Sequence, residues 1–480
     1  MAPPKSSGVM KRQLKRLCNN MALLDAQNFY LVGIKGVAMA SIAQCLLDAG
    51  KNVSGSDIEE DFVTEPILSR LAIKIDEIAN IPDFAEQNIE AVVYTAAHQG
   101  VDNPQVKAAM QAGIPIYTQA QALAEFFNQK DGVAVCGVGG KSSVSAMITF
   151  VLNQLAPQEL SFSVGVGEII GMPRTGQWKS EAKYFVAEAD EYVIDPHARE
   201  KGQAFTPRFA FLEPFATVCT NLKYDHPDVY ASFEDTKTTF AKFFSQIKNN
   251  GHLIINGDNQ DLVQLTRELA RPDLKITTFG ESEACDFKLQ DFHFALQVPG
   301  KFNLINALAS LACLVQLGFD PEQIVSSLNQ FKSTKRRFEL VKKDEQHWHY
   351  DDYAHHPSEI LAVIDTLNEN FGEQKKMISF QPHTFSRTRQ LFDDFVDALA
   401  THTKPNDEIL LIDIFPSARE TFDPDMNCDK LAAAVKAKYP NCQIQNLKTR
   451  EALANYIKQS NYNVFITIGA GDIYHAHELL

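Results

Sequence analysis

The sequence predicts an α/β fold in which mostly parallel sheets carry helices on both faces. Apolar, strand-like runs alternate with helical patterns almost from end to end of the chain, as is typical of such sheets. The length of 480 residues exceeds what one hydrophobic core usually supports. Three segments look like a strand that opens a sheet, namely 28–36, 133–140 and 376–380. We therefore predict three domains.

Two polar stretches mark the expected domain boundaries. The run FFNQKDG at 126–132 has the composition of a short connector, and FKSTKRRFE at 331–339 follows a helical pattern and precedes a strand-like one. The prediction is an arm at 1–27, a Rossmann-like domain at 28–130, a central P-loop domain with a mostly parallel sheet at 131–334, and a Rossmann-like domain at 335–480.

Composition and charge exclude several classes of partner. The formal charge of −15 and a pI near 5.4 argue against a nucleic-acid-binding surface. No apolar run is long enough to cross a bilayer, so no membrane partner is expected. Eight cysteines stand singly, without a CxxC pair, and the basic run at 10–17 is not followed by the apolar segment of a secretory signal. We expect reduced thiols and a cytoplasmic location.

The first glycine loop follows the strand-like run NFYLV. It reads Gly33-Ile-Lys-Gly36 and leads into a helical pattern and then into the strand KNVSGSD, which ends at Asp57. This is a βαβ unit, and a loop of this kind directs backbone N–H groups toward a diphosphate. Asp57 lies where such folds place an acid near a ribose or base. The alternative is a glycine turn required only for close packing of the helix.

The second glycine loop is the most informative stretch of the chain. The run VAVCGVGGKSS at 133–143 gives a strand, a glycine loop, a lysine, a hydroxyl group and then a helix. Backbone N–H groups can cradle phosphates, Lys141 can reach a terminal phosphate, and Ser142 can ligate Mg²⁺. We predict a site for ATP and Mg²⁺ formed by Gly137, Gly139, Gly140, Lys141, Ser142 and Ser143. The alternative is a glycine-rich turn that precedes a lysine by chance.

Acidic and imidazole side chains follow two later strand-like runs. YFVAEADEY places Glu188, Asp190 and Glu191 at the end of a strand, and ATVCTNLKYDHPD does the same for Asn221, Asp225 and His226. Because the carboxyl ends of parallel strands converge on one edge of the sheet, these groups are expected to meet the Mg²⁺ that a triphosphate carries. The predicted metal-associated residues are Ser142, Glu188 and His226. Taken alone, Glu188 also fits a solvated turn and His226 a surface position.

Several motifs, in order, resemble those of the Mur ligases, the ATP-dependent amide-forming enzymes of peptidoglycan precursor synthesis. They run from residue 29 to about residue 473. The first domain carries YLVGIKGVAMASIA and GSDIE; the second carries GVGGKSS, AEADEY, TNLKYDHPD, PGKFNLINALAS and KRRFE; the third carries DDYAHHPSEI, FQPHTFSRTR, DIFPSARE and IGAGDIY.

The resemblance implies a role for each matching position. Lys141, the glycine loop and Arg337 would hold phosphates, with Glu188 and His226 at the metal. Asn303 and Asn306 would lie at the adenine and Asp352 at the ribose of ATP. Tyr353, His355, His383 and Arg387 would lie near the acceptor amino acid and the reacting centre, with either His355 or His383 taking the ammonium proton. The uridine diphosphate would bind at Gly33, Lys35, Gly36, Val37, Ala38 and Met39, with Asp57 beside it.

The third-domain motif QPHTFSRTR favours the branch of the family that joins L-alanine to the carboxylate of UDP-N-acetylmuramate through an acyl phosphate. The family's loop usually reads GTHGKTT, so Val138 and Gly139 depart from it, and Phe302 stands where histidine is common. Two alternatives stay open, a recycling ligase that adds a whole murein tripeptide and a weakly catalytic nucleotide-binding regulator. We expect a monomer or a homodimer.

Overall fold

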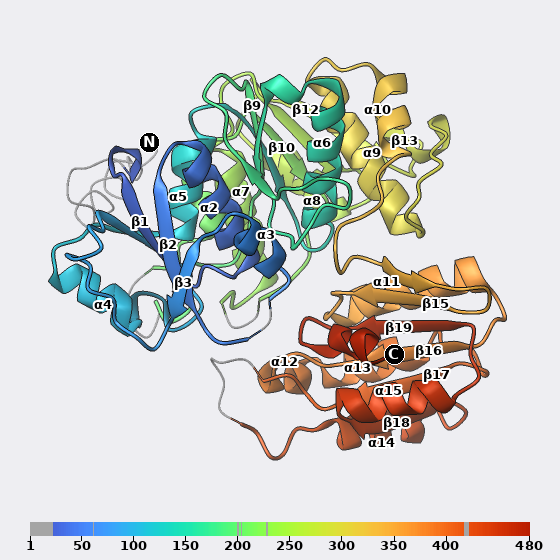
Figure 1. Cartoon of the computed structure of the whole chain (residues 1–480). Helices are drawn as coiled ribbons and strands as arrows, with labels where there is room; N and C mark the ends of the chain where they lie inside the picture. The colour runs from blue at the N-terminus through green and yellow to red at the C-terminus, as the bar shows by residue number, and fades with distance from the viewer. Residues whose placement is uncertain (1–22, 61, 199–200, 203, 227–228, 417–421) are drawn as a thin grey trace. The chain divides into compact units, whose positions relative to one another are not determined.

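The computed structural model describes residues 23–60, 62–198, 201–202, 204–226, 229–416 and 422–480. The chain forms two compact units, one running to residue 294 with the addition of 306–329, the other comprising 295–305 and 330–480. Three sheets are present, and all strand pairs but two are parallel (Figure 1). The predicted α/β class is therefore confirmed. The first unit holds two of the sheets, and the predicted boundaries near 130 and 334 stay predictions.

The first sheet has five parallel strands in the order β3-β2-β1-β4-β5. Apolar side chains from one face pack against α2 and α5, and those from the other face pack against α4. Since the strand order reverses between β1 and β4, the loop after β1 lies at the usual ligand position of such a sheet. The elements are β1 (Asn28–Val32), α2 (Val37–Asp48), β2 (Asn52–Asp57), α3 (Glu65–Arg70), β3 (Lys74–Glu77), β4 (Ala91–Tyr94), α4 (Pro104–Gln111), β5 (Ile116–Thr118) and α5 (Gln119–Phe127).

The central sheet has eight strands in the order β13-β12-β11-β10-β6-β9-β7-β8, with only β8 antiparallel to its neighbour. Its strands are β6 (Asp131–Cys136), β7 (Leu160–Ser163), β8 (Gly176–Gln177), β9 (Tyr184–Glu188), β10 (Ala216–Cys219), β11 (His252–Asn256), β12 (Lys275–Gly280) and β13 (Phe287–Lys288). Its helices are α6 (Lys141–Leu155), α7 (Phe233–Phe244), α8 (Gln260–Glu268), α9 (Lys301–Gln316) and α10 (Pro321–Leu328). Strand β6 lies between β10 and β9, so the loop after β6 lies beside the ends of both.

Buried polar contacts join the first sheet's helix α2 to the central sheet within the first unit. Ser41 Oγ lies 2.7 Å from Ser163 Oγ, and Gln44 Nε2 donates to Thr175 Oγ1 at 3.0 Å. An added Cβ at Gly176 would lie 2.0 Å from the carbonyl oxygen of Ser41, which requires glycine there. These contacts hold the two sheets of the first unit in one arrangement.

The third sheet, in the second unit, has six strands in the order β14-β15-β19-β16-β17-β18, and only β14 is antiparallel. Figure 1 shows this sheet layered between helices. One apolar face packs against α11, α13 and α14, and the other against α15 and the terminal 3₁₀ helix η6 (Ile473–Leu479). The elements are β14 (Glu339–Lys343), β15 (Trp348–Asp352), α11 (Pro357–Phe371), β16 (Lys376–Phe380), α12 (Phe385–Gln390), α13 (Phe392–Ala400), β17 (Glu408–Ile412), α14 (Cys428–Lys438), β18 (Gln443–Lys448), α15 (Arg450–Gln459) and β19 (Val464–Ile468).

One expectation about this sheet is wrong. The segment 376–380 does not open it, because β14 and β15 precede it in the chain. The charged, mostly exposed residues of β14 conceal its strand pattern, whereas β15 lies in the strand-like run expected after residue 339.

No helix in the described part of the chain is long and apolar enough to span a bilayer. The seven cysteines within the described ranges are free thiols. Most of the predicted arm, Cys18 and the last four residues of DIFPSARE lie outside those ranges.

Candidate active site

The second glycine loop joins β6 to α6 through residues in left-handed backbone conformations. Gly137 has a φ of 114°, and an added Cβ would lie 2.4 Å from Thr220 Oγ1. Both constraints require glycine. Thr220 Oγ1 in turn donates to the carbonyl of Gly139 at 2.7 Å. Thr220, which directly follows the neighbouring strand β10, therefore binds this loop through a carbonyl group and not through an N–H group.

The N–H groups of this loop are available to a ligand. Among the described residues, none accepts a hydrogen bond from the backbone N–H of residues 137–140. Helix α6 begins at Lys141 without a side-chain cap, so its first N–H groups and its dipole also point outward. A phosphate group fits this set of donors.

Lys141 forms a buried ion pair. Its Nζ lies 2.9 Å from both carboxylate oxygens of Glu191, whose side chain is 1% exposed. Burial alone would lower the pKa of Lys141, but Glu191 and Asp190 raise it well above its ordinary value. The ammonium group therefore stays charged and can meet an anionic phosphate. Glu191 lies in the predicted run, but its pairing with Lys141 was not predicted.

A set of possible metal ligands surrounds the same carboxylate. One ligand atom each from Glu191, Asp225 and His226 lies within 4.8 Å of the others. Close by in sequence, the amide oxygen of Asn221 is buried without a partner among the described residues. Carboxylate oxygens suit a hard divalent cation such as Mg²⁺. The residues present therefore fit a divalent metal.

The other two predicted metal residues are Ser142 and Glu188. Ser142 is buried in the first turn of α6, directly after Lys141. Glu188 ends β9, its charge helps to raise the pKa of Lys141, and its Oε1 accepts from the N–H of Gly165 at 3.2 Å. The cluster thus combines the predicted His226 with Glu191 and Asp225, and the metal roles of Ser142 and Glu188 stay predictions.

Asn306 and Asn303 lie in α9, which crosses from one unit to the other. An added Cβ at Gly140 would lie 2.8 Å from Asn306 Oδ1, so this amide faces the second glycine loop. Asn303 Nδ2 donates to the carbonyl of Pro299 at 2.7 Å.

The first glycine loop is built differently. The N–H groups of Gly33 and Ile34 donate to the carbonyl of Ser56, at 2.8 and 3.1 Å. The N–H of Lys35 donates to Asp57 Oδ2 at 2.7 Å. The chain itself uses these donors, and the N–H of Met39 donates to the carbonyl of Gly36 at 2.9 Å. Among the described residues, none accepts from the N–H groups of Val37 and Ala38 at the start of α2, so these two are open to a ligand.

Asp57 braces this first loop from the end of β2. Its side chain is almost fully buried, and besides Lys35 it accepts from the N–H of Ile58 at 2.9 Å. His98 Nε2 lies 3.3 Å from Asp57 Oδ1. Lys35 Nζ contacts Glu65 Oε1 at 2.6 Å and the carbonyl of Glu60 at 2.9 Å. His98 has a left-handed φ of 52° and was not among the predicted site residues.

In the second unit, Arg337, Asp352 and Tyr353 lie together at the carboxyl end of β15. The Arg337 guanidinium lies 5.4 Å from the ring centre of Tyr353. Burial raises the pKa of Asp352 to about 6, against the opposing charge of Arg337. Its two oxygens accept the N–H groups of Phe338 and Ala354, both at 2.7 Å. Asp352 therefore joins the backbone directly after Arg337 to the backbone directly after β15.

His355 and His383 are also brought together in this unit. Their ring centres lie 6.4 Å apart, and His355 Nδ1 lies 3.0 Å from the carbonyl of Tyr353. Burial lowers the pKa of His355, and the nearby charge of Arg387 adds to that effect while Glu359 opposes it. The imidazole of His355 is therefore neutral near pH 7 and able to accept a proton.

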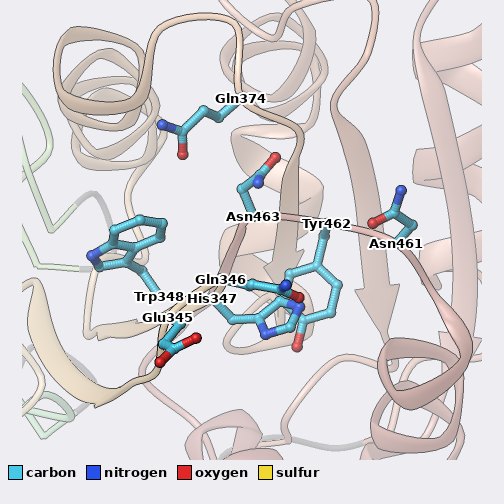
Figure 2. Close-up of a pocket in the computed structure, with 8 residues that line it drawn as sticks. All are labelled: Glu345, Gln346, His347, Trp348, Gln374, Asn461, Tyr462 and Asn463. Atoms are coloured by element: carbon cyan, nitrogen blue, oxygen red, sulfur yellow. The ribbon is translucent and has the colours of Figure 1, made fainter.

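A pocket of about 460 Å³ lies at the opposite edge of the third sheet, where β15 begins and just before β19 (Figure 2). It is lined by Glu345, Gln346, His347, Trp348, Gln374, Asn461, Tyr462 and Asn463. Asp352 lies four positions after Trp348 on β15, a distance of roughly 13 Å along a strand. The pocket is therefore separate from the predicted site residues of this unit.

The fold and the two loops define an α/β protein in which one glycine loop presents open N–H groups and the other belongs to a βαβ unit. Comparison with family models agrees with this description over most of the chain. Residues 28–131 match the model of the Mur ligase family, catalytic domain; residues 135–314 match the Mur ligase middle domain; and residues 336–471 match the Mur ligase, glutamate ligase domain. The chain belongs to the Mur ligase family, as its motifs predict.

Curated relatives extend along the whole chain. A UDP-N-acetylmuramate–L-alanine ligase of Caldanaerobacter subterraneus is 32% identical, with 95% of this chain and 98% of the relative covered. An enzyme of the same name from Desulfitobacterium hafniense is 30% identical over 93% and 98% of the two chains. The solved structure of UDP-N-acetylmuramate-alanine ligase MurC from Thermotoga maritima has a TM-score of 0.73 at 23% identity, covering 94% of this chain and 97% of that one. At that identity the structural likeness supports the fold alone.

Proposed function

We propose that this protein is an ATP-dependent ligase that joins L-alanine to the carboxylate of UDP-N-acetylmuramate. The products are UDP-N-acetylmuramoyl-L-alanine, ADP and phosphate, in a step of peptidoglycan precursor synthesis. The observation that carries the proposal is the end-to-end match to relatives of that name, together with an open phosphate loop that presents a charged Lys141. Because the reaction consumes ATP, we propose that it takes place in the cytoplasm.

The first chemical requirement is neutralisation of charge. A substrate carboxylate must approach the γ-phosphate, and two anions approach only where cations reduce their repulsion. Lys141 supplies one fixed positive charge, and the donors of the loop after β6 hold the phosphate oxygens. We assign the same purpose to Arg337 in the second unit.

Mg²⁺ is the proposed metal. When bound, it would neutralise phosphate charge and polarise the phosphoryl oxygen. Glu191, Asp225 and His226 would hold it, and the amide oxygen of Asn221, unpartnered among the described residues, could accept a hydrogen bond from a ligand water. The predicted contributions of Ser142 and Glu188 belong to the same proposal.

The second requirement is an amine free of its proton. L-Alanine enters as an ammonium ion, and attack on the acyl phosphate needs the neutral amine. A neutral, half-buried His355 beside His383 is suited to accept that proton. The C–N bond then forms as the phosphate leaves with the electrons of the C–O bond.

The assay that tests the proposal measures phosphate release with ATP, Mg²⁺ and UDP-N-acetylmuramate. L-Alanine, glycine, L-serine and the murein tripeptide are offered separately, and the product is identified by its mass. We expect turnover with L-alanine above the other acceptors. Turnover with the tripeptide alone would instead establish a recycling ligase, and no turnover with any acceptor would favour a regulator that kept the fold.

A further inference from the structure

We propose that Arg336 is a positioning residue that holds the adjacent Arg337 in its working orientation. The two arginines are neighbours in the linker that leads into β14, but they are placed differently. Arg336 is buried and Arg337 is half-buried. The inference rests on the proposed function, because the phosphate role of Arg337 does.

Every nitrogen of the Arg336 side chain has a partner within the second unit. Nε donates to Asp351 Oδ2 at 3.0 Å, Nη1 to the carbonyl of Gly471 at 3.1 Å, and Nη2 to the carbonyl of Gly469 at 2.5 Å. Asp351 lies on β15, and both glycines follow β19. A single guanidinium thus ties the linker to two strands of the third sheet.

The main partner of Arg336 is itself fixed. Asp351 is 2% exposed, and its second oxygen accepts the hydroxyl of Thr467 at 2.6 Å. A buried carboxylate whose oxygens are both engaged offers one defined position for the arginine. Its charge would be left unpaired in the interior without Arg336.

Two aromatic rings flank the guanidinium. The ring centre of Tyr474 lies 4.1 Å from Arg336 Cζ, and that of Tyr353 lies 5.2 Å away. Tyr353 is also the ring beside Arg337, at 5.4 Å. Both guanidinium groups therefore lie against the ring of Tyr353. A shift of Arg336 would move this ring, and with it a contact of Arg337. Lysine cannot reproduce a planar group that stacks and donates in three directions.

The backbone around Arg337 is strained on both sides. Arg336 and Phe338 have left-handed φ values of 62° and 47°. Such conformations are strained for residues other than glycine and persist only where surrounding contacts hold them. The N–H of Phe338 donates to Asp352 Oδ2 at 2.7 Å, and the carbonyl of Arg336 accepts from Tyr353 at 2.7 Å. The Arg336 side chain is the largest of these anchors.

The test is a double-mutant cycle of Arg336→Lys with Arg337→Ala, read as kcat and KM for each substrate in the phosphate-release assay. We expect Arg336→Lys to lower kcat by about 10- to 100-fold, the cost of misplacing a catalytic group. KM for UDP-N-acetylmuramate should change little. In the double variant, Arg336→Lys should add nothing to the loss caused by Arg337→Ala. Additive losses, or wild-type kcat in Arg336→Lys, would overturn the proposal.

A second readout does not depend on activity. Hydrogen exchange at the amides of Phe338 and Tyr353 should become faster in Arg336→Lys, while protection across β16 and β17 stays unchanged. Unchanged exchange at those two amides contradicts the proposal even if the wild type proves to have another activity. Failure of the proposed function would appear separately, as absent turnover in the wild type.

Two further variants serve as a matched arginine control and as a substitute if Arg336→Lys does not fold. Arg450→Lys alters a more exposed arginine whose partner, Asp472 at 3.3 Å, adjoins the same loop, and it should leave kcat and exchange at Phe338 unchanged. If Arg336→Lys does not fold, Tyr474→Leu removes one aromatic wall and keeps the three hydrogen bonds. It should give a smaller loss of kcat, again absent in the Arg337→Ala background, and an additive loss would contradict the proposal.

Discussion

The two glycine loops of the first unit share a sequence pattern but differ in what they offer a ligand. Each follows the first strand of its sheet and precedes a helix. In the first loop, Ser56 and Asp57 of the neighbouring strand take up the N–H groups of residues 33–35. In the second loop, Thr220, directly after the neighbouring strand, binds a carbonyl instead, and no described residue accepts from the N–H groups of 137–140. The residue at the end of the adjacent strand therefore decides whether the N–H groups of such a loop are used by the chain or left open to a ligand.

The charges around the loops differ in the same sense. Lys35 in the first loop contacts Glu65 and a backbone carbonyl, and these contacts suit a residue that positions a bound substrate. Lys141, directly after the second loop, contacts the buried carboxylate of Glu191, which is itself one of the possible metal ligands. This difference predicts that the second loop serves the chemical step and the first serves binding.

The largest expected effect is that of Lys141→Ala. It removes the fixed charge that offsets γ-phosphate repulsion, so kcat for phosphate release should fall by at least about 10³-fold. The matched change in the first loop, Lys35→Ala, should raise KM for UDP-N-acetylmuramate and leave kcat within about threefold. Equal losses of kcat in both variants would remove the proposed division between the loops.

One control is needed because Lys141→Ala leaves buried Glu191 unpaired. Losing one partner of a buried ion pair costs about 3–5 kcal/mol of folding free energy. The double variant Lys141→Ala with Glu191→Ala removes both charges and should recover much of the melting temperature without recovering turnover. Recovered turnover would show that Lys141 acts only on stability.

The next effect concerns the glycines themselves. Gly137→Ala places a Cβ 2.4 Å from Thr220 Oγ1 at a φ of 114°, so the cradle must distort. We expect affinity for ADP, measured by calorimetry, to fall by about tenfold or more, since 1.4 kcal/mol is tenfold in affinity. Gly33→Ala, with Thr95 Cγ2 at 2.5 Å, should instead weaken UDP-N-acetylmuramate and leave ADP binding unchanged.

Gly50→Ala is the matched control for both glycine variants. Its φ of 75° is also left-handed, but apart from its two chain neighbours no described residue has an atom within 4 Å of the added Cβ. It should cost about 1–2 kcal/mol of stability and change neither affinity. An equal loss of ADP affinity in Gly50→Ala would mean that the effect of Gly137→Ala is not local.

A smaller effect is expected for Asp57→Asn. The amide keeps one acceptor for the loop but loses the charge beside His98 and one strong hydrogen bond. A hydrogen bond to a charged group is worth about 1.5–3 kcal/mol, so KM for UDP-N-acetylmuramate should rise by about tenfold. ADP affinity should not change. A fall in ADP affinity would contradict the proposal that the first loop binds UDP-N-acetylmuramate and the second binds the nucleotide phosphates.

The sequence predicted the two loops and their place in the fold because strand, glycine and helix signals are local. It did not distinguish an open loop from a braced one, since that depends on Thr220 and Asp57, which come from other strands. The pairing of Lys141 with Glu191 was missed for a similar reason. AEADEY contains three acids, and only the turn after β9 decides which of them faces the loop. The sequence places Arg336 in a polar boundary stretch and in the motif KRRFE but does not single it out, because no local pattern reveals that Asp351 and Gly469 surround it.

The smallest expected effect is on the pH dependence of folding stability near the second loop. Burial lowers the pKa of His226, but the contact with Glu191 and the charges of Asp225 and Asp190 outweigh it, so the pKa is raised above 6.5. A group whose pKa is higher in the folded state stabilises the fold when protonated. That stabilisation is complete below pH 6.5 and is lost as the pH rises through the folded pKa.

Melting temperatures measured in chelator from about pH 6 to about pH 8 should therefore fall more steeply for the wild type than for His226→Asn. An exposed histidine of the same unit provides the comparison, because His293→Asn should keep the wild-type slope. Parallel slopes in all three proteins would mean that the acidic surroundings of the second loop do not hold a proton on His226.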